Sequence, residues 1–321
     1  MRMNSPKVSV IIAVYNVEKY IERCARSLFS QTLDDLEFLF IDDCTPDNSI
    51  NIVKEVLNEF PFRKSQTRFL KMETNSKQAA VRTKGILEAK GDYIIHCDPD
   101  DWIEPDMYEV MYDEAVKNNA DIVSSLIKQE GNDIFEKFKI EIFNKGIDAL
   151  KSHKVSHSLM NKLIRRSLLR AHKILPFPNI NYGEDCNTVM RAYFFAGKVV
   201  AIDKVFYHYD RSNENAITTE KIEWLLDNYS IRNIQLLEQF FEENAGEEFR
   251  PLLASVKFAT KSPLLLSAHK DGAKWVDYFP ECHQYIRKWK EMPTLYRYAL
   301  WLAANHKWAV KLIAKYLNRK N

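Results

Sequence analysis

The chain has 321 residues, of which 46% are hydrophobic and 12% aromatic, a profile that excludes a largely disordered or fibrous protein. Its 46 basic and 44 acidic residues give a net charge of +2, so the composition as a whole gives no support to a nucleic-acid partner. Five widely spaced cysteines without a C-x-x-C pair support neither a disulfide framework nor a zinc site.

The first 130 residues alternate between short β-branched runs and amphipathic helical patterns. The predicted elements are strand 8–14, helix 20–28, strand 36–41, helix 48–57, strand 67–72, helix 78–89, strand 93–97, helix 105–117 and strand 121–127. This rhythm predicts an α/β domain with a mostly parallel, doubly wound sheet. The following segment, to about residue 211, is less regular and contains two strand-like runs, 198–202 and 205–209.

After Thr219 the pattern becomes helical, with predicted helices at 248–269, 272–291 and 294–317. The change predicts two parts, a domain at 1–219 and a helical C-terminal region at 220–321. The N-terminus leads directly into a strand without the apolar region of a signal peptide. No apolar run approaches the roughly 18 residues of a membrane span. We therefore expect a cytoplasmic location.

The run Asp98-Pro99-Asp100-Asp101 is the most informative feature of the chain. Three carboxylates within four residues repel one another, and the preceding strand delivers them to its carboxyl end, where α/β sheets bind ligands. Oxygen ligands on a short loop suit Mg²⁺ or Mn²⁺ holding a phosphorylated substrate. An acidic solvated turn is the alternative. An EF-hand fits poorly, because Trp102 and Ile103 would occupy positions that it gives to an oxygen ligand and glycine.

Polar residues also end the first two predicted strands, as Tyr15-Asn16 and Asp42-Asp43. In a parallel sheet these ends converge on one crevice. No G-x-G-x-x-G follows the first strand, and no G-x-x-x-x-G-K-S/T occurs anywhere. Dinucleotide-binding and P-loop functions are therefore weakly supported.

In this order and spacing, the motifs resemble the family 2 glycosyltransferases, inverting sugar transferases with the GT-A fold. The matching segments are VSVIIAVYN (8–16), SLFSQT (27–32), IDD (41–43), RTKGI (82–86), GDY (91–93) and DPDDW (98–102). The match is dense over the first 130 residues and thins out towards Thr219. The resemblance implies a nucleotide-sugar donor, Mn²⁺ or Mg²⁺ as cofactor, and a glycan or lipid-linked acceptor.

The resemblance places the nucleotide base near Ala13 and Tyr15, with Tyr15 stacking on the base and Asp43 accepting a hydrogen bond from it. Ala13 stands where many relatives have Pro or Thr. Arg82 would face the diphosphate or the donor sugar. The alternatives are a core aromatic for Tyr15, a capped turn for Asp43, and a solvated helix cation for Arg82.

The same resemblance makes Asp98 and Asp100 the D-x-D element, with Asp98 contacting the ribose and Asp100 binding the metal. Asp98 is a further candidate ligand for the metal. Asp101 would be a second ligand or would bind the donor sugar. Which of Asp100 and Asp101 contacts the metal first is open.

The candidate general base is Asp185, in the sequence Tyr182-Gly183-Glu184-Asp185. Carboxylates at the start of a helix suit its dipole, so helix capping is the alternative. The resembled family keeps a Glu-Asp pair here with the Asp as base. Glu184 would then shape the acceptor site or hold Asp185, and Lys162 is a further acceptor-pocket candidate.

Two later residues extend the resemblance, in a segment that closes over the diphosphate in many relatives. Arg211 would contact the phosphates, because a guanidinium matches phosphate geometry. His208 would bind the metal or phosphate, with a structural strand histidine as the alternative. The segment 75–78 lacks the glycine usual in relatives, which leaves the identity of the donor sugar open.

The last 28 residues carry six basic side chains and no acidic one. Lys307, Lys311, Lys315 and Arg319 follow i, i+4 spacing, which predicts a basic stripe on an amphipathic helix. Such a helix would lie on the inner face of an anionic membrane or would pack its apolar face on the body of the protein.

Together with the resemblance, these features predict an inverting, metal-dependent transferase that moves a hexose-type sugar from a nucleotide donor, expected to be a UDP-sugar, during surface-polysaccharide synthesis. A catalytically degenerate nucleotide-sugar-binding scaffold is the first alternative. A sugar nucleotidyltransferase is the second, but it would need a basic, glycine-rich loop after the first strand, and the chain has none.

Overall fold

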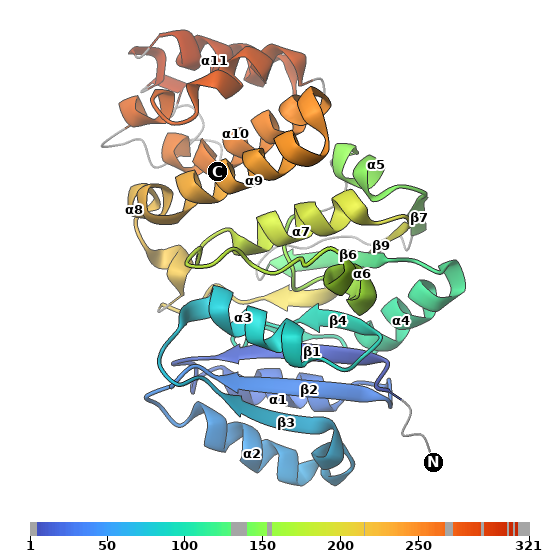
Figure 1. The fold of residues 1–321 in the computed structure, drawn as a ribbon. Helices are drawn as coiled ribbons and strands as arrows, with labels where there is room; N and C mark the ends of the chain where they lie inside the picture. Colours follow the sequence, from blue (N-terminus) through green and yellow to red (C-terminus); the bar gives the residue numbers. More distant parts are fainter. Residues whose placement is uncertain are drawn as a thin grey trace. The chain divides into compact units, whose positions relative to one another are not determined.

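The computed structural model describes residues 5–129, 140–152, 156–214, 216–266, 272–289, 292–306, 308–310 and 312–313. The chain folds into two compact units, Met1–Thr219 and Glu220–Asn321. The first unit contains the sheet and every residue predicted for the site, and the second is helical (Figure 1).

The first unit is built on one sheet with the strand order β3-β2-β1-β4-β8-β6-β9-β5, and β7 pairs with β9. The strands are β1 (Val8–Val14), β2 (Leu36–Asp42), β3 (Thr67–Lys71), β4 (Tyr93–His96), β5 (Trp102–Ile103), β6 (Ile122–Gln129), β7 (Ile140–Phe143), β8 (Lys162–Arg165) and β9 (Val199–Tyr209). As predicted, β3, β2, β1 and β4 pair in parallel.

Beyond β4 the sheet is mixed. Strand β8 runs antiparallel to both β4 and β6, whereas β6 and β9 are parallel. The expectation of a mostly parallel sheet therefore describes the first half only, because antiparallel neighbours need no helical crossover. The two strand-like runs predicted at 198–202 and 205–209 form the single long strand β9.

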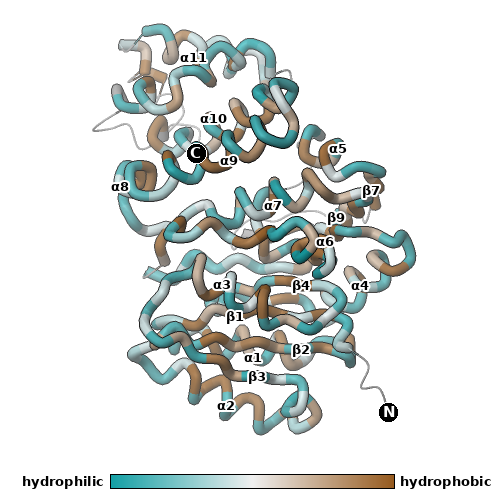
Figure 2. Tube along the Cα trace, viewed as in Figure 1, coloured by the Kyte–Doolittle hydropathy of each residue, from teal (hydrophilic) through white to brown (hydrophobic). Residues whose placement is uncertain are grey.

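Helices cover both faces of β1. Alternate residues Val8, Val10 and Ile12 share a buried cluster with α1 (Ile21–Phe29) and α2 (Ser49–Glu59). On the opposite face, α3 (Lys77–Glu88) lies so close that a Cβ on Gly85 would collide with the Ile11 side chain. Hydrophobic positions follow β1 and β2 in Figure 2. This two-sided burial explains why these strands read as continuous apolar runs.

The remaining helical segments of the first unit connect the later strands. They are 3₁₀ helix Pro61–Gln66, α4 (Met107–Asn118), α5 (Gly146–Lys151), α6 (Arg166–Ala171), α7 (Glu184–Phe195) and 3₁₀ helix Ile217–Thr219. Helix α7 begins at Glu184, so Glu184 and Asp185 form its first turn.

The second unit consists of helical segments. They are α8 (Ile222–Leu225), π-helix Leu226–Ser230, α9 (Ile231–Asn244), 3₁₀ helix Gly246–Phe249, α10 (Arg250–Leu266), 3₁₀ helices Gly272–Val276 and Pro280–Lys288, and α11 (Thr294–Asn305). They pack around a cluster that includes fully buried Trp275, Leu300 and Ala303. Among the described residues, no helix is long and apolar enough to cross a bilayer.

Two helices predicted for this unit are wrong in extent. The predicted helix 272–291 is split into two 3₁₀ segments, because Phe279 takes a left-handed φ of 46° immediately before Pro280. Helix α11 ends at Asn305, and His306 is extended, so 294–317 is not one straight helix. Lys307, Lys311, Lys315 and Arg319, which make up the predicted basic stripe, lie outside the described residues.

Candidate active site

The acidic loop follows β4 at the carboxyl end of the parallel half of the sheet. The Asp101 main-chain N–H donates to the Asp98 carbonyl at 3.2 Å, so the three carboxylates lie on one tight turn. The Tyr207 hydroxyl of β9 accepts from the Asp98 main-chain N–H at 3.1 Å and donates to Asp101 Oδ2 at 2.6 Å. Strand β9 therefore holds the turn from the side.

Asp101 is buried and satisfied by protein donors. Besides the Tyr207 hydroxyl, its Oδ1 accepts the Asp210 main-chain N–H at 2.8 Å. Burial and the neighbouring charges of Asp98 and Asp100 raise the pKa of Asp101 to about 9. Because protein donors already occupy both oxygens of Asp101, this carboxyl is better suited to shaping the loop than to binding a metal.

Asp100 is held differently. One of its oxygens, Oδ2, accepts from the Asn213 side-chain amide at 2.8 Å. Burial, and after it the charge of Asp98, raises the pKa of Asp100 to about 6. A bound cation would relieve this repulsion. Of the two carboxyls left open by the sequence, the geometry favours Asp100 as the ligand.

Arg82 links the acidic loop to helix α7. Arg82 is only 4% exposed, which rules out a solvated helix cation. Nη2 donates to Asp98 Oδ1 at 2.9 Å, and Nη1 pairs with Glu184. The positive charge of Arg82 also lowers the pKa of Asp185 against the opposing effect of burial. One buried cation thus joins Asp98, Glu184 and Asp185 in a single site.

Glu184 and Asp185 lie in the first turn of α7. Gly183 precedes them with a φ of 77°, a left-handed conformation that glycine adopts readily. Asp185 Oδ1 accepts the Cys186 main-chain N–H at 2.7 Å, which is the helix-start contact expected from the capping alternative. Burial raises the pKa of Asp185 and raises that of Glu184 to about 7. A raised pKa makes a carboxylate a stronger base.

Lys162, at the start of β8, is completely buried. Its ammonium donates to Ser156 Oγ at 3.0 Å and to Asn161 Oδ1. Burial lowers the pKa of Lys162 to about 7, and the charge of Asp185 opposes that effect. Lys162 therefore lies within electrostatic reach of the candidate base.

The proposed base pocket has one exposed ring and one buried carboxylate. Tyr15 is 43% exposed, so it is not a core aromatic, and Lys77 Nζ lies 5.9 Å from its ring centre. Asp43 accepts the main-chain N–H groups of Ser76 and Lys77 at 2.7 and 2.9 Å, as its capped-turn alternative predicts. Each carboxylate oxygen has a second lone pair, so Asp43 retains acceptor capacity. Ala13 is partly buried at the end of β1.

His208 has a structural environment. Its ring stacks on Trp102 at 5.0 Å and bonds Glu104 Oε1 at 2.6 Å. Successive strand residues face opposite sides. Because Tyr207 faces the acidic loop, His208 points away from it, which favours the structural alternative over a metal ligand. Arg211 lies exposed just after Asp210, at the end of β9.

Three residues that organise the site were not predicted as site residues. Tyr207 and Asn213 hold the acidic loop as described above. Arg23 of α1 pairs with Asp210, donates to the Asp100 carbonyl at 3.0 Å and lies 3.7 Å above the Trp102 ring. Because neighbouring strand residues face opposite sides, the sequence could have indicated that Tyr207 faces the site if His208 does not. The contacts of Arg23 and Asn213 join segments that are distant in the sequence, so no local pattern predicts them.

The residues present fit a divalent cation that is shared with a substrate. Within the described part of the chain, no three His, Cys, Asp or Glu side chains form a complete metal site. Mg²⁺ and similar ions need only one or two protein carboxylates when substrate phosphates and water supply the other ligands. Asp100 and Asp98 provide that minimal set.

Comparison with known proteins identifies the family. The model of "Glycosyl transferase family 2" matches residues 9–174, about half of the chain. The chain belongs to glycosyl transferase family 2. Its relatives include "Putative glycosyltransferase EpsH" of Bacillus subtilis (strain 168), 36% identical over 218 residues, which are 64% of this chain and 61% of that protein. The "Cholesterol galactosyltransferase" of Borreliella burgdorferi is 32% identical over 63% of this chain and 59% of its own.

Solved structures agree on the GT-A fold. The S. aureus TarS 1–349 complex with UDP-GlcNAc superimposes with a TM-score of 0.62 at 16% identity, covering 98% of this chain and 92% of that one. The mannosyltransferase PcManGT of Pyrobaculum calidifontis, in complex with GDP-Man and Mn²⁺, gives a TM-score of 0.56 at 14% identity, with 98% and 88% coverage. Both the family and the fold class that the sequence predicted are confirmed.

Proposed function

We propose that this chain is an inverting glycosyltransferase that moves a hexose-type sugar from a UDP-sugar to a glycan or lipid-linked acceptor in surface-polysaccharide synthesis. In this assignment residues 1–219 are the catalytic domain. The observation that carries the proposal is the contact of Arg82 with both Asp98 and Glu184. It brings the loop suited to a nucleotide diphosphate and the helix with the candidate base into one site.

The donor side of the site combines aromatic, acidic and basic groups. Tyr15 offers an exposed ring for stacking on the base, Asp43 accepts a hydrogen bond from the base, and Arg211 faces the phosphates. Asp98 and Asp100 would hold Mn²⁺ or Mg²⁺, which when bound offsets the negative charge of the leaving diphosphate. The bound UDP-GlcNAc in the TarS structure supports a UDP donor.

The acceptor side is centred on Asp185. In a single displacement, the acceptor oxygen forms a bond to the anomeric carbon as the bond from that carbon to the diphosphate oxygen breaks. The bonding pair leaves with the diphosphate, and Asp185 takes the acceptor proton. Glu184 keeps Arg82 in place, and Lys162 provides a nearby ammonium or amine for the acceptor pocket.

Calorimetry with UDP tests the donor side. The wild type should bind UDP more tightly with Mn²⁺ than with EDTA, and Asp100→Asn should lose that difference while keeping weak metal-free binding. Equal UDP affinity of the wild type with Mn²⁺ and with EDTA would favour the scaffold alternative. Thermal stabilisation by a panel of nucleotide sugars then identifies the donor.

We also propose that the C-terminal region contacts the inner face of an anionic membrane. Four large apolar side chains are exposed there, Leu295 (75%), Tyr298 (54%), Trp308 (64%) and Leu312 (62%). The same segment carries six basic residues and no acidic one, so charge complementarity points to anionic lipid. Trp308→Ser/Leu312→Ser should reduce sedimentation with phosphatidylglycerol vesicles, whereas Phe62→Ser should not. Unchanged sedimentation of the double variant would contradict the contact.

A further inference from the structure

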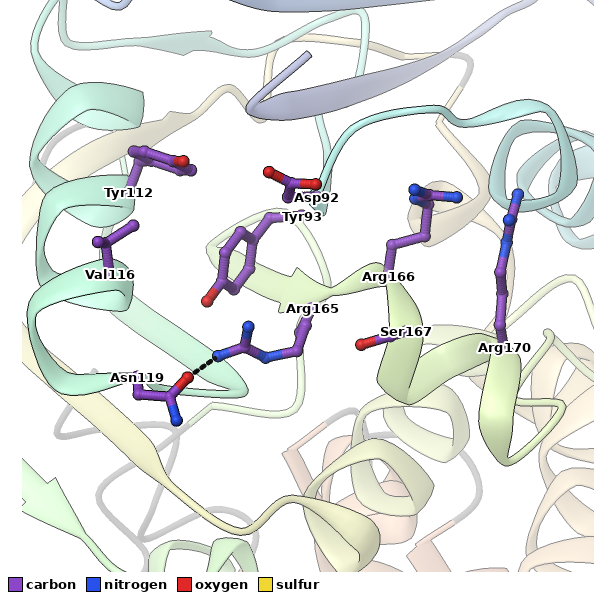
Figure 3. Close-up of a pocket in the computed structure, with 9 residues that line it drawn as sticks. All are labelled: Asp92, Tyr93, Tyr112, Val116, Asn119, Arg165, Arg166, Ser167 and Arg170. Atoms are coloured by element: carbon purple, nitrogen blue, oxygen red, sulfur yellow. Dashed lines mark hydrogen bonds between the residues drawn. The ribbon is translucent and has the colours of Figure 1, made fainter. Parts of the chain in front are cut away.

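A second polar pocket lies at the end of β4 opposite the acidic loop. It has a volume of about 520 Å³, and Figure 3 shows its lining. Asp92 and Tyr93 line it at the start of β4, whereas Asp98 follows the end of that strand. The five residue steps from Tyr93 to Asp98 correspond to roughly 16 Å of extended chain, so this pocket is separate from the donor site.

Three arginines from one short segment line the pocket, Arg165, Arg166 and Arg170. The protein orients each of them. Arg165 donates to Asp121 at 3.0 Å and to Asn119 at 2.9 Å, the second bond being drawn in Figure 3. Arg166 Nε donates to the Gly91 carbonyl, and Arg170 Nη2 donates to the Ala89 carbonyl at 3.3 Å. These contacts fix the guanidinium groups before any ligand arrives.

The orienting contacts leave donor capacity. A guanidinium has five N–H donors. Among the described residues, Arg166 and Arg170 each use one nitrogen for a main-chain carbonyl. Ser167 adds a hydroxyl at the same rim. Several hydrogen-bond donors therefore remain for a ligand in this pocket.

The charge of the lining is positive. Arg165 is paired with Asp121, which leaves Arg166 and Arg170 against Asp92, the sole carboxylate among the residues that line the pocket. Burial and the neighbouring charge of Arg170 both lower the pKa of Arg166, because two guanidinium groups one helical turn apart repel each other. A bound anion would remove this repulsion.

The opposite wall is less polar. Tyr93 and Tyr112 meet edge to face with ring centres 6.0 Å apart, and Val116 of α4 lies beside them at the rim, 57% exposed. The wall suits the organic part of a ligand whose anionic end faces the arginines. Inorganic phosphate alone would leave this wall uncovered.

We propose that this pocket is a second ligand site, which binds a phosphate or diphosphate group through Arg166 and Arg170, independently of the donor site. Guanidinium groups bind phosphate oxygens through paired, charge-assisted hydrogen bonds. The phosphate belongs either to a soluble organic phosphate or to a lipid headgroup, and both present the same chemistry to the arginines.

Titration calorimetry of the full chain with pyrophosphate in EDTA tests the site without a metal at the acidic loop. Arg166→Gln/Arg170→Gln should weaken binding about tenfold or more, because two charge-assisted contacts are lost. Arg250→Gln, an exposed arginine of the second unit, is the matched control and should bind as the wild type does. Absent wild-type binding, or equal binding by the double variant, overturns the proposal.

Val116→Glu guards against a folding defect in the arginine variant. It adds a carboxylate to the exposed rim without removing any arginine contact, and it should also weaken pyrophosphate binding, whereas Val116→Gln should not. Sedimentation with phosphatidylglycerol vesicles distinguishes the sources when it is measured in the Trp308→Ser/Leu312→Ser background, where the proposed C-terminal contact does not contribute. A loss in the double arginine variant identifies a lipid headgroup, and unchanged sedimentation with weakened pyrophosphate binding identifies a soluble phosphate. If Val116→Glu binds pyrophosphate normally, the pocket is not the site.

Discussion

Replacing Arg82 by methionine tests the buried connection between the acidic loop and helix α7. The change removes the cation from two carboxylates, Glu184, which is 4% exposed, and Asp98. Breaking a buried ion pair by removing one partner costs about 3–5 kcal/mol of unfolding free energy. We expect Arg82→Met to lower the free energy of unfolding by an amount in this range at pH 8.

The loss should depend on pH. Burial raises the pKa of Glu184 to about 7 from an ordinary 4.5, so ionising Glu184 in the fold lowers stability as pH rises between these values. Arg82 opposes this rise in pKa. Without Arg82 the pKa of Glu184 moves higher, and the loss of stability extends above pH 7. Arg82→Met should therefore be less damaging at pH 6 than at pH 8.

A double-mutant cycle supplies the control. Arg82→Met/Glu184→Gln removes both charges of one contact, so its loss should fall short of the sum of the two single losses by about 1–3 kcal/mol. Hydrogen exchange of peptides from α7 in urea follows the first unit separately from the second. Single losses that add within about 0.5 kcal/mol, or an Arg82→Met protein as stable as the wild type, would refute the buried bridge.

Two further substitutions test the other ends of the site. Tyr15→Ala should weaken UDP binding about tenfold, since base stacking on an aromatic ring is worth about 1–3 kcal/mol. The free energy of unfolding should stay near that of the wild type, because the ring is exposed. Equal UDP affinity of Tyr15→Ala and the control Tyr298→Ala would contradict the stacking role. Lys162 has its pKa lowered to about 7 from 10.5, so the wild type should gain up to about 3 kcal/mol relative to Lys162→Met between pH 7 and pH 9.5. If the stability difference between the wild type and Lys162→Met does not change with pH, the pKa of Lys162 is not lowered by folding, and the prediction is wrong.

The parallel half of the sheet follows from sequence because its strands are continuous β-branched runs that end in polar residues. Strands β1, β2 and β4 are buried between helices, and burial on both faces produces that pattern. Strand β8 has four residues and antiparallel neighbours, so it leaves no comparable signal. The prediction of one helix at 272–291 is wrong because Phe279 takes a left-handed conformation that interrupts the helix, and the apolar spacing of the sequence gives no sign of this interruption.

The candidate site shows the same division. The acidic run at the end of a strand pointed to Asp98 and Asp100, and the resemblance to the family pointed to Asp185. The contacts that decide between neighbours are tertiary. Tyr207 satisfies Asp101 and leaves Asp100 as the better ligand, and the direction of β9 turns His208 towards Trp102. Neither contact follows from local sequence.

The most direct test of the central claim is sugar transfer by Asp185→Asn, measured beside its affinity for UDP with Mn²⁺. The exposed Asp203→Asn is the control. If Asp185 is the general base, transfer should fall about 10²–10⁴-fold while UDP affinity stays near the wild-type value. Transfer by Asp185→Asn at the rate of the Asp203→Asn control would contradict the account.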